Sequence, residues 1–205
     1  MLKRIGTTSG ALVMGMTLAT GAAAQAGHDV VIETEAGVMI LDLDYEKAPV
    51  SACNFAMYVR LSDYDQGSFF RSVVAASNDN PNPIDVIQAA TPRGSDDALR
   101  PAIKLERTRD TGLRHVAGAI SMARDGPDTA TSSFFIVTQD TPSLDFGGGR
   151  NPDGQGFAVF GHLVSGLDVA RQIQALPTDG QEQITPPVRI NAVHMLTPAP
   201  EQCGS

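Results

Sequence analysis

Two short apolar segments, Ala117–Ala123 and Phe134–Val137, stand on either side of the polar loop Arg124–Ser132. The first segment alternates apolar and polar residues and the second is aromatic and β-branched, so both are typical of β-strands. The loop contains Asp-Gly-Pro-Asp at 125–128, in which glycine allows a positive φ, proline restricts φ and each aspartate can bond its own backbone. The pattern predicts two strands joined by a specified turn, and taken alone it indicates a hairpin loop without a function.

The same short-strand pattern recurs along the chain. Further strands are expected at Val30–Thr34, Val38–Leu43, Phe69–Val74, Ile84–Ala89, Ala158–Val164 and Val188–Met195. Two helices are expected, one from Pro49 with a buried stripe at Ala52, Phe55, Ala56 and Val59, and one over Leu167–Leu176. Because strands and helices do not alternate in a βαβ pattern, the sequence predicts a mainly β fold, a closed antiparallel eight-stranded barrel capped by two helices.

Residues 1–26 have the parts of a secretory signal peptide in the required order. Two basic residues precede the apolar run Ala11–Leu18, which is too short to span a bilayer, and the segment ends in the small-x-small triplet Ala24-Gln25-Ala26. We therefore expect cleavage before Gly27, a periplasmic or secreted protein, and no membrane insertion after cleavage. The expected divisions are the signal peptide at 1–26, one domain at 27–197 and a C-terminal tail at 198–205.

The chain is acidic, with a formal charge of −8 and a pI of about 4.8. Removing the predicted signal peptide takes away two of the 15 basic side chains and none of the 23 acidic ones, so the charge becomes −10. Such a chain repels nucleic acid and lacks the basic, aromatic-interleaved surface that binds single strands. Acidity of this size is typical of a soluble protein, and we expect a monomer with one core.

Cys53 and Cys203 are the two cysteines, and neither has the spacing of a zinc site. Cys53 is expected at the edge of the first helix's buried stripe as a partly buried, inert thiol, and pairing with Cys203 in an oxidising compartment is the alternative. No HExxH motif and no neighbouring nucleophile motif occurs among the histidines, which are His28, His115, His162 and His194. The sequence therefore predicts neither a zinc centre nor a Ser-His-Asp triad, and no metal or other cofactor is expected.

Ser121-Met122-Ala123, Gly126-Pro127 and Phe134-Phe135-Ile136 stand in the order of a known signature. This segment resembles the cyclophilin family of peptidyl-prolyl cis-trans isomerases. Further matching segments lie along most of the chain: Thr34–Leu43, Ala48-Pro49, Asn54-Phe55, Phe69-Phe70-Arg71, Val86-Ile87-Gln88, Leu144-Asp145, Val159-Phe160-Gly161 and Gly166–Val169. The resemblance implies a cyclophilin-like barrel and isomerisation of Xaa-Pro bonds in Pro-containing segments of exported proteins.

The resemblance also implies which residues form the site. Arg71 matches the family arginine that donates to the prolyl nitrogen in the twisted transition state, although an isolated arginine at a strand start would be expected to form a surface salt bridge. Phe135, Val86 and Leu144 are expected to line a slot for the proline ring, with Phe69 beneath. The remaining expected substrate-binding residues are Gln88, Ala123, Arg124 and Phe157.

The chain departs from the family pattern at several of these positions. Phe70 stands in place of the usual His, Ala89-Ala90 in place of Gly-Gly, and Ser133 in place of Gln. Ser143 stands where many members have Trp or another large residue, and Phe157 where a substrate-facing His is common. Each lost polar contact is expected to cost about 1 kcal/mol, so activity should be reduced rather than abolished. The alternative function is a weakly active or inactive cyclophilin-fold peptide-binding module or chaperone. A small-ligand carrier is disfavoured because a packed Val/Ile/Phe interior leaves no lumen.

Overall fold

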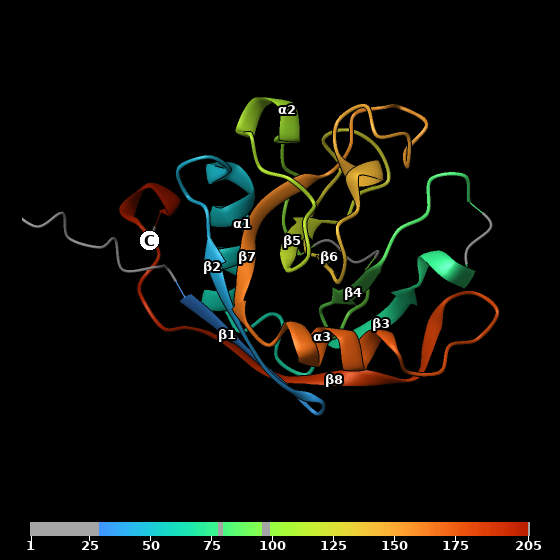
Figure 1. Ribbon diagram of the computed structural model, residues 1–205. Coiled ribbons are helices and arrows are strands. Elements are labelled where there is room, and N and C mark those ends of the chain that lie inside the picture. The colour runs from blue at the N-terminus through green and yellow to red at the C-terminus, as the bar shows by residue number, and fades with distance from the viewer. Residues whose placement is uncertain (1–28, 78–79, 96–98, 205) are drawn as a thin grey trace, which may run out of the picture.

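The computed structural model describes residues 29–77, 80–95 and 99–204, so the predicted signal peptide lies outside the described residues. Within these ranges the strands are β1 (Asp29–Thr34), β2 (Gly37–Leu43), β3 (Ser68–Val73), β4 (Val86–Ala90), β5 (Ala119–Met122), β6 (Phe134–Val137), β7 (Ala158–Ser165) and β8 (Gln183–Met195). They close into an antiparallel barrel in the order β1-β2-β7-β5-β6-β4-β3-β8 (Figure 1). The predicted fold class is confirmed.

Three α-helices accompany the barrel in the described ranges: α1 (Pro49–Arg60), α2 (Thr108–Thr111) and α3 (Leu167–Gln174). Helices α1 and α3 confirm the two predicted ones, whereas the four-residue α2 is additional. Short 3₁₀ helices lie in the connections at η1 (Ala75–Ser77), η2 (Pro142–Leu144) and η3 (Glu201–Cys203). None of the helices in the described part of the chain is both long and apolar enough to cross a bilayer.

Strand β8 starts at Gln183 rather than at the predicted Val188. Pro186 and Pro187 hide this start in the sequence, because a proline cannot donate to the ladder and is unusual inside a strand. The added segment pairs with β3, with Gln183 opposite Arg71. The longer strand therefore brings residues 182–183 beside the arginine that the sequence singles out.

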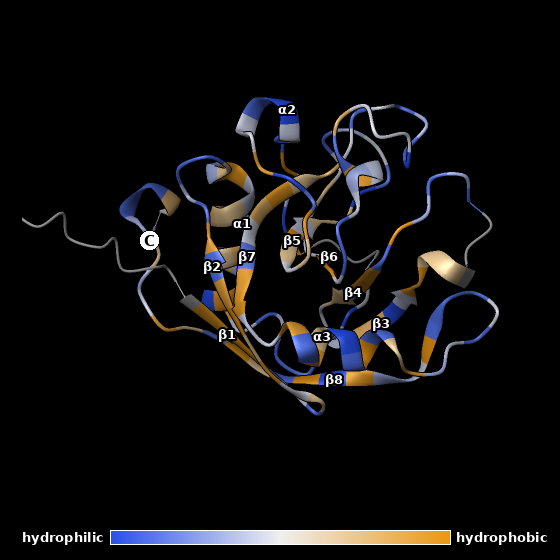
Figure 2. Ribbon diagram, viewed as in Figure 1, coloured by the Kyte–Doolittle hydropathy of each residue, from blue (hydrophilic) through white to orange (hydrophobic). Residues whose placement is uncertain are grey.

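The main core fills the barrel and extends under α1. Hydrophobic residues concentrate along the strands, while the connecting loops are mostly hydrophilic (Figure 2). Phe134 on β6 is fully buried and meets the rings of Phe55, Tyr64 and Phe69 edge-on, at centroid distances of 5.3, 5.3 and 6.0 Å. The predicted stripe of α1 is buried as expected. Aromatic contacts of this kind add stability beyond the area that they bury.

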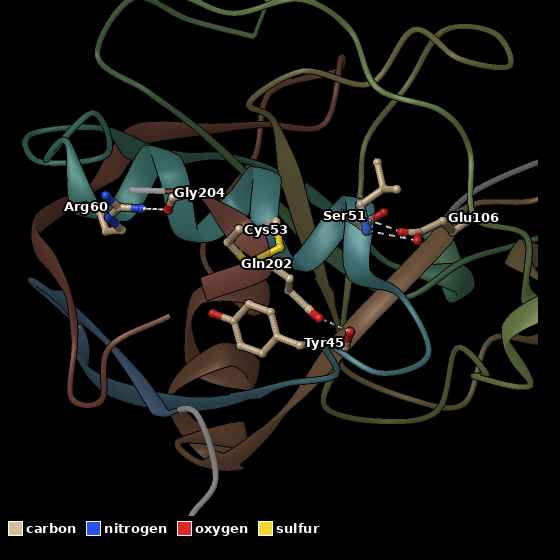
Figure 3. The surroundings of a disulfide bond; sticks show 9 residues. Tyr45, Ser51, Cys53, Arg60, Glu106, Gln202 and Gly204 are labelled. Atoms are coloured by element: carbon tan, nitrogen blue, oxygen red, sulfur yellow. Dashed lines mark hydrogen bonds between the residues drawn. A yellow bond between two sulfur atoms is a disulfide. The ribbon is translucent and has the colours of Figure 1, made fainter. Parts of the chain in front are cut away.

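A disulfide joins Cys53 of α1 to Cys203 of η3 (Figure 3), with the two Cα atoms 4.9 Å apart. The expectation that Cys53 is an inert free thiol is therefore wrong, and the alternative pairing is the observed one. The chain end is also held by two hydrogen bonds, from Arg60 Nη1 to the Gly204 carbonyl (2.7 Å) and from Gln202 Nε2 to the Tyr45 carbonyl (3.0 Å). Sequence could not establish the pair, because the geometry that permits a disulfide exists only once the tail lies on α1.

Candidate active site

A β-bulge in β3 decides where Arg71 lies. The register of β3 shifts between Phe69 and Arg71 against both neighbouring strands, β4 and β8. Residues two apart on a strand normally point to the same face of the sheet. The extra residue at Phe70 interrupts this alternation, so Phe69 and Arg71 point to opposite faces. Phe69 therefore lies in the core, fully buried against Phe134, while Arg71 emerges on the outer face of the barrel.

The Arg71 side chain lines a groove of about 290 Å³ on this outer face. Eight of the nine predicted site residues line it: Arg71, Val86, Gln88, Ala123, Arg124, Phe135, Leu144 and Phe157. The exception is Phe69, expected to lie beneath the slot as part of the substrate site; the bulge places it in the core instead, where it does not line the groove. Strand alternation on β4 and β6 explains three of the eight, since Val86, Gln88 and Phe135 face outward there.

Phe135 forms the floor of an apolar slot in the groove. It clusters with Ile84, Val86 and Leu144 in a hydrophobic group separate from the main core. The imidazole of His115 stacks on the Phe135 ring at 5.9 Å with 14° between the planes, and Phe157 meets the ring edge-on at 5.4 Å. Two aromatic neighbours therefore hold the ring in one orientation.

Arg71 is held by two side chains, one from β4 and one from the residue that immediately precedes β8. Its Nη1 donates to Gln88 Oε1 on β4 (3.1 Å), and Gln88 Nε2 in turn donates to Ser133 Oγ (3.1 Å). Its Nε and Nη2 both donate to Glu182 Oε2, at 3.1 and 2.6 Å. The salt bridge expected of an isolated arginine therefore forms, with the side chains of Arg71 and Glu182 30% and 31% exposed. Because Arg71 lines the groove, this salt bridge lies at the groove wall.

His115 sits in a buried hydrogen-bonded chain with Asp145 and Ser121. Its Nδ1 lies 2.8 Å from Asp145 Oδ1, and its Nε2 lies 3.0 Å from Ser121 Oγ. Burial lowers the pKa of His115, so the ring is neutral at pH 7, donates to the carboxylate and accepts from the hydroxyl. Burial raises the pKa of Asp145, but the hydrogen bonds from the His115 side chain and backbone, together with the charge of Arg114, outweigh this and lower it.

This Ser-His-Asp arrangement was not predicted from the sequence, because Asp145 is 30 residues from His115 and the two meet only in the fold. Ser121 is fully buried, so its hydroxyl has no access to a substrate. The chain instead fixes His115 under Phe135 and anchors Asp145, the neighbour of the slot residue Leu144. Its role in this geometry is to support the groove floor. In the described part of the chain, no three His, Cys, Asp or Glu side chains are grouped as metal ligands would be.

Arg124 ties the glycine-rich loop at 147–156 to the rim of the groove. Its side chain is 1% exposed, and its terminal nitrogens donate to the Asp153 carboxylate at 2.7 and 3.0 Å. Nε and Nη2 also donate to the Gly156 carbonyl, and the guanidinium lies over the Phe157 ring at 5.1 Å. The Arg124 hydrogen bond is the main cause of the lowered Asp153 pKa. Beside it, the Ala123 N–H donates to the Ser133 carbonyl within the barrel.

Sequence reasoning did not select several groove residues. Arg150 is the most chemically distinct of them: burial and then the charge of Arg71 lower its pKa, while the charge of Glu182 raises it. Because it lies in a glycine-rich loop without a recognisable motif, no sequence signal identifies it. The other residues of this kind are Ile84, Ser95, Asp125, Thr129, Thr131, Ser133 and Asn151.

A family model matches residues 29–195, and its description is "Cyclophilin type peptidyl-prolyl cis-trans isomerase/CLD". A peptidyl-prolyl cis-trans isomerase A of Dickeya dadantii is 38% identical over 160 residues, covering 77% of this chain and 76% of the relative. A peptidyl-prolyl cis-trans isomerase of Acinetobacter baylyi is 32% identical over 200 residues, covering 95% of this chain and 96% of the relative.

Solved structures show the same fold at low sequence identity. A cyclophilin-type isomerase of Cryptosporidium parvum, crystallised in the presence of the dipeptide Ala-Pro, has a TM-score of 0.67 and 20% identity, covering 83% of this chain and 99% of the other. The cyclophilin AquaCyp293 of Hirschia baltica has a TM-score of 0.63 and 19% identity, covering 85% and 76% of the two chains.

Proposed function

Because the chain belongs to the cyclophilin-type peptidyl-prolyl cis-trans isomerase family, we propose that it accelerates rotation about Xaa-Pro bonds of exported proteins, with Arg71 as its catalytic residue. The observation that carries this proposal is the position of the Arg71 guanidinium in one groove with an apolar slot of Phe135, Val86 and Leu144. The slot accepts a proline ring, and the guanidinium supplies the donor that the rotating bond needs.

Rotation must break amide conjugation, against a barrier of about 18–20 kcal/mol for a peptide bond. In the twisted state the prolyl nitrogen regains a lone pair, so a fixed donor binds this state better than either planar one. Arginine suits this role because it stays charged and holds its donors in a rigid fork. Arg71 donates to Glu182 and Gln88, and each terminal nitrogen has a second hydrogen that these bonds do not use. No proton transfer or covalent step is needed.

The location of the substrates rests on two independent features. The signal-peptide pattern at 1–26 predicts export, and the Cys53–Cys203 disulfide is of the kind that persists in oxidising compartments. We therefore propose that the protein acts in the periplasm or outside the cell, as a monomer. Mass spectrometry of an envelope fraction should find a chain that starts at Gly27; a pool that keeps Met1 throughout would contradict export.

The test of the activity is isomerisation of a Pro-containing peptide, followed by exchange NMR on wild type and Arg71→Ala at matched peptide occupancy. Arg71→Ala should lower kcat and kcat/KM together, because it removes a contact made in the transition state. The loss should correspond to about 2–4 kcal/mol of transition-state stabilisation. Phe135→Ala is the contrasting variant: emptying the slot should weaken peptide binding as well and destabilise the fold by about 3–5 kcal/mol.

Two outcomes separate the possible failures. If wild type binds the peptide without accelerating its isomerisation, the protein is the peptide-binding module. The loss of the Gln, His and Gly-Gly partners, replaced here by Ser133, Phe70 and Ala89-Ala90, favours that alternative. If Arg71→Ala isomerises as fast as wild type, the activity stands but Arg71 is not its catalytic residue.

A further inference from the structure

Glu182 is the acidic partner of Arg71, and no sequence motif singles it out. One of its carboxylate oxygens accepts from both Nε and Nη2 of Arg71, at 3.1 and 2.6 Å. It lies immediately before β8, one of the two strands that flank β3 in the barrel. A carboxylate in this place fixes the side of the guanidinium that points away from Gln88.

The backbone at Glu182 is held in a conformation that a residue with a side chain rarely adopts. Its φ is 64°, in the left-handed region, where Cβ crowds the backbone. Asp179 maintains the turn: its Oδ1 accepts from the N–H groups of Gln181 (2.8 Å) and Gln183 (2.9 Å), and its carbonyl accepts from the Glu182 N–H (3.2 Å). The Glu182 carbonyl also accepts from the Ser72 N–H on β3 (2.9 Å). Backbone strain of this kind tends to occur at functional sites.

These contacts complete a clamp around the guanidinium. Gln88, itself bonded to Ser133, holds Nη1 from the β4 side, and Glu182 holds Nε and Nη2 from the β8 side. All three nitrogens of one rigid, planar group are thereby placed, by a residue on β4 and by a residue that immediately precedes β8. Because the two partners hold opposite sides of the guanidinium, they restrict its plane to one orientation relative to the groove. One partner alone would leave the group free to rotate.

Glu182 also offsets repulsion within the groove. Arg71 and Arg150 both line it, and the charge of Arg71 lowers the pKa of Arg150 while the charge of Glu182 opposes that effect. The carboxylate therefore favours keeping two guanidinium groups in the same groove.

We propose that Glu182 is a positioning residue that holds the Arg71 guanidinium in the orientation required at the twisted prolyl nitrogen. This inference rests on the proposed isomerase function. Glu182 acts through Arg71 and has no direct contact with the reacting bond. Since its contribution lies in geometry more than in charge, a neutral side chain that keeps the accepting oxygen should replace it.

The test compares Glu182→Ala and Glu182→Gln with wild type, with kcat and KM taken from exchange NMR on a Pro-containing peptide. Glu182→Ala should lower kcat about tenfold with KM little changed, the size of coupling expected between neighbours in one hydrogen-bonded network. Glu182→Gln should keep most of the activity, because its amide oxygen can still accept from Nε and Nη2. In an Arg71→Ala background, adding Glu182→Ala should change nothing further.

A second measurement reports on the clamp without any turnover. In wild type the Nε–H resonance of Arg71 should be sharp and slow to exchange with water, and in Glu182→Ala it should exchange faster. Glu35→Ala is the matched control: it removes another Arg–Glu pair of β8, the exposed contact of Arg189 with Glu35 (2.8 Å), which does not line the groove. It should leave kcat, KM and the Arg71 resonance as in wild type.

Several results would overturn the inference while leaving the isomerase function intact. These are an unchanged kcat in Glu182→Ala, an equal loss in Glu182→Gln and Glu182→Ala, or the same loss with and without Arg71. An Arg71 resonance that does not respond to Glu182→Ala would show that the carboxylate does not hold the guanidinium. Inactive wild type would instead overturn the proposed function, and with it the catalytic part of the inference.

Discussion

Phe134 and Phe135 are adjacent on β6, yet their rings serve opposite faces of the barrel. Phe134 lies at the centre of the core, and Phe135 forms the groove floor. The residue that fixes Phe135 is His115, whose own orientation depends on Asp145 and Ser121. At the scale of single residues, the site is therefore built from a buried polar chain beneath an apolar slot.

His115 should make stability depend on pH. Its pKa is lowered in the folded state, so the unfolded chain binds a proton that the folded chain excludes. The unfolding free energy should therefore fall as pH drops from about 7 to about 5, by at most about 1.4 kcal/mol per pH unit for this proton. Asp145, whose pKa is also lowered, adds a further loss below about pH 4.

Urea unfolding at several pH values checks this prediction. His115→Asn should show a shallower fall between about pH 7 and pH 5 than wild type. Equal slopes in wild type and His115→Asn would contradict the assignment of a buried, neutral imidazole.

The first turn of α1 is capped by a residue far away in sequence. The residue before the helix, Ala48, has no side chain that could cap it, and Glu106 instead accepts from the N–H groups of Val50 (2.9 Å) and Ser51 (2.7 Å), as Figure 3 shows for Ser51. A carboxylate there satisfies unpaired donors and complements the positive end of the helix dipole. At the scale of elements, α1 thus depends on the connection between β4 and α2.

Glu106→Ala should lower the unfolding free energy by about 1 kcal/mol, the usual cost of losing an N-terminal cap. Glu106→Gln should cost less, since an amide oxygen can still accept one of the two bonds. Glu46→Ala alters an exposed acidic residue close to the same helix and should have little effect. Chemical denaturation of the three variants measures these differences, and equal stability of Glu106→Ala and Glu46→Ala would argue against the cap.

At the scale of the whole molecule, the disulfide closes a loop between cysteines 150 positions apart. Cross-links over long loops restrict the unfolded chain, and removing one typically costs about 2–4 kcal/mol. The double variant Cys53→Ala/Cys203→Ala should therefore have a lower Tm than wild type. A reducing agent should lower the Tm of wild type and leave the double variant unchanged; a wild type insensitive to reductant would show that the tail contacts suffice without the bond.

The sequence by itself determined the barrel and its two main helices, and its resemblance to the cyclophilin family implied eight of the residues that line the groove. Alternating apolar residues specify strands, their order follows from the matched segments, and Val86, Gln88 and Phe135 face outward by simple alternation on β4 and β6. The strands and helices are local features, because each depends on residues close together in the chain.

Only the tertiary structure decided the features that join distant segments. The bulge at Phe70 separates Phe69 from Arg71, and it is visible only as a register shift against β4 and β8. The pairing of Cys53 with Cys203, the chain from Asp145 to Ser121, and the contact of Glu182 with Arg71 each join residues that no local pattern relates. Their physical basis is proximity created by tertiary packing, which brings side chains of separate segments within bonding distance of one another.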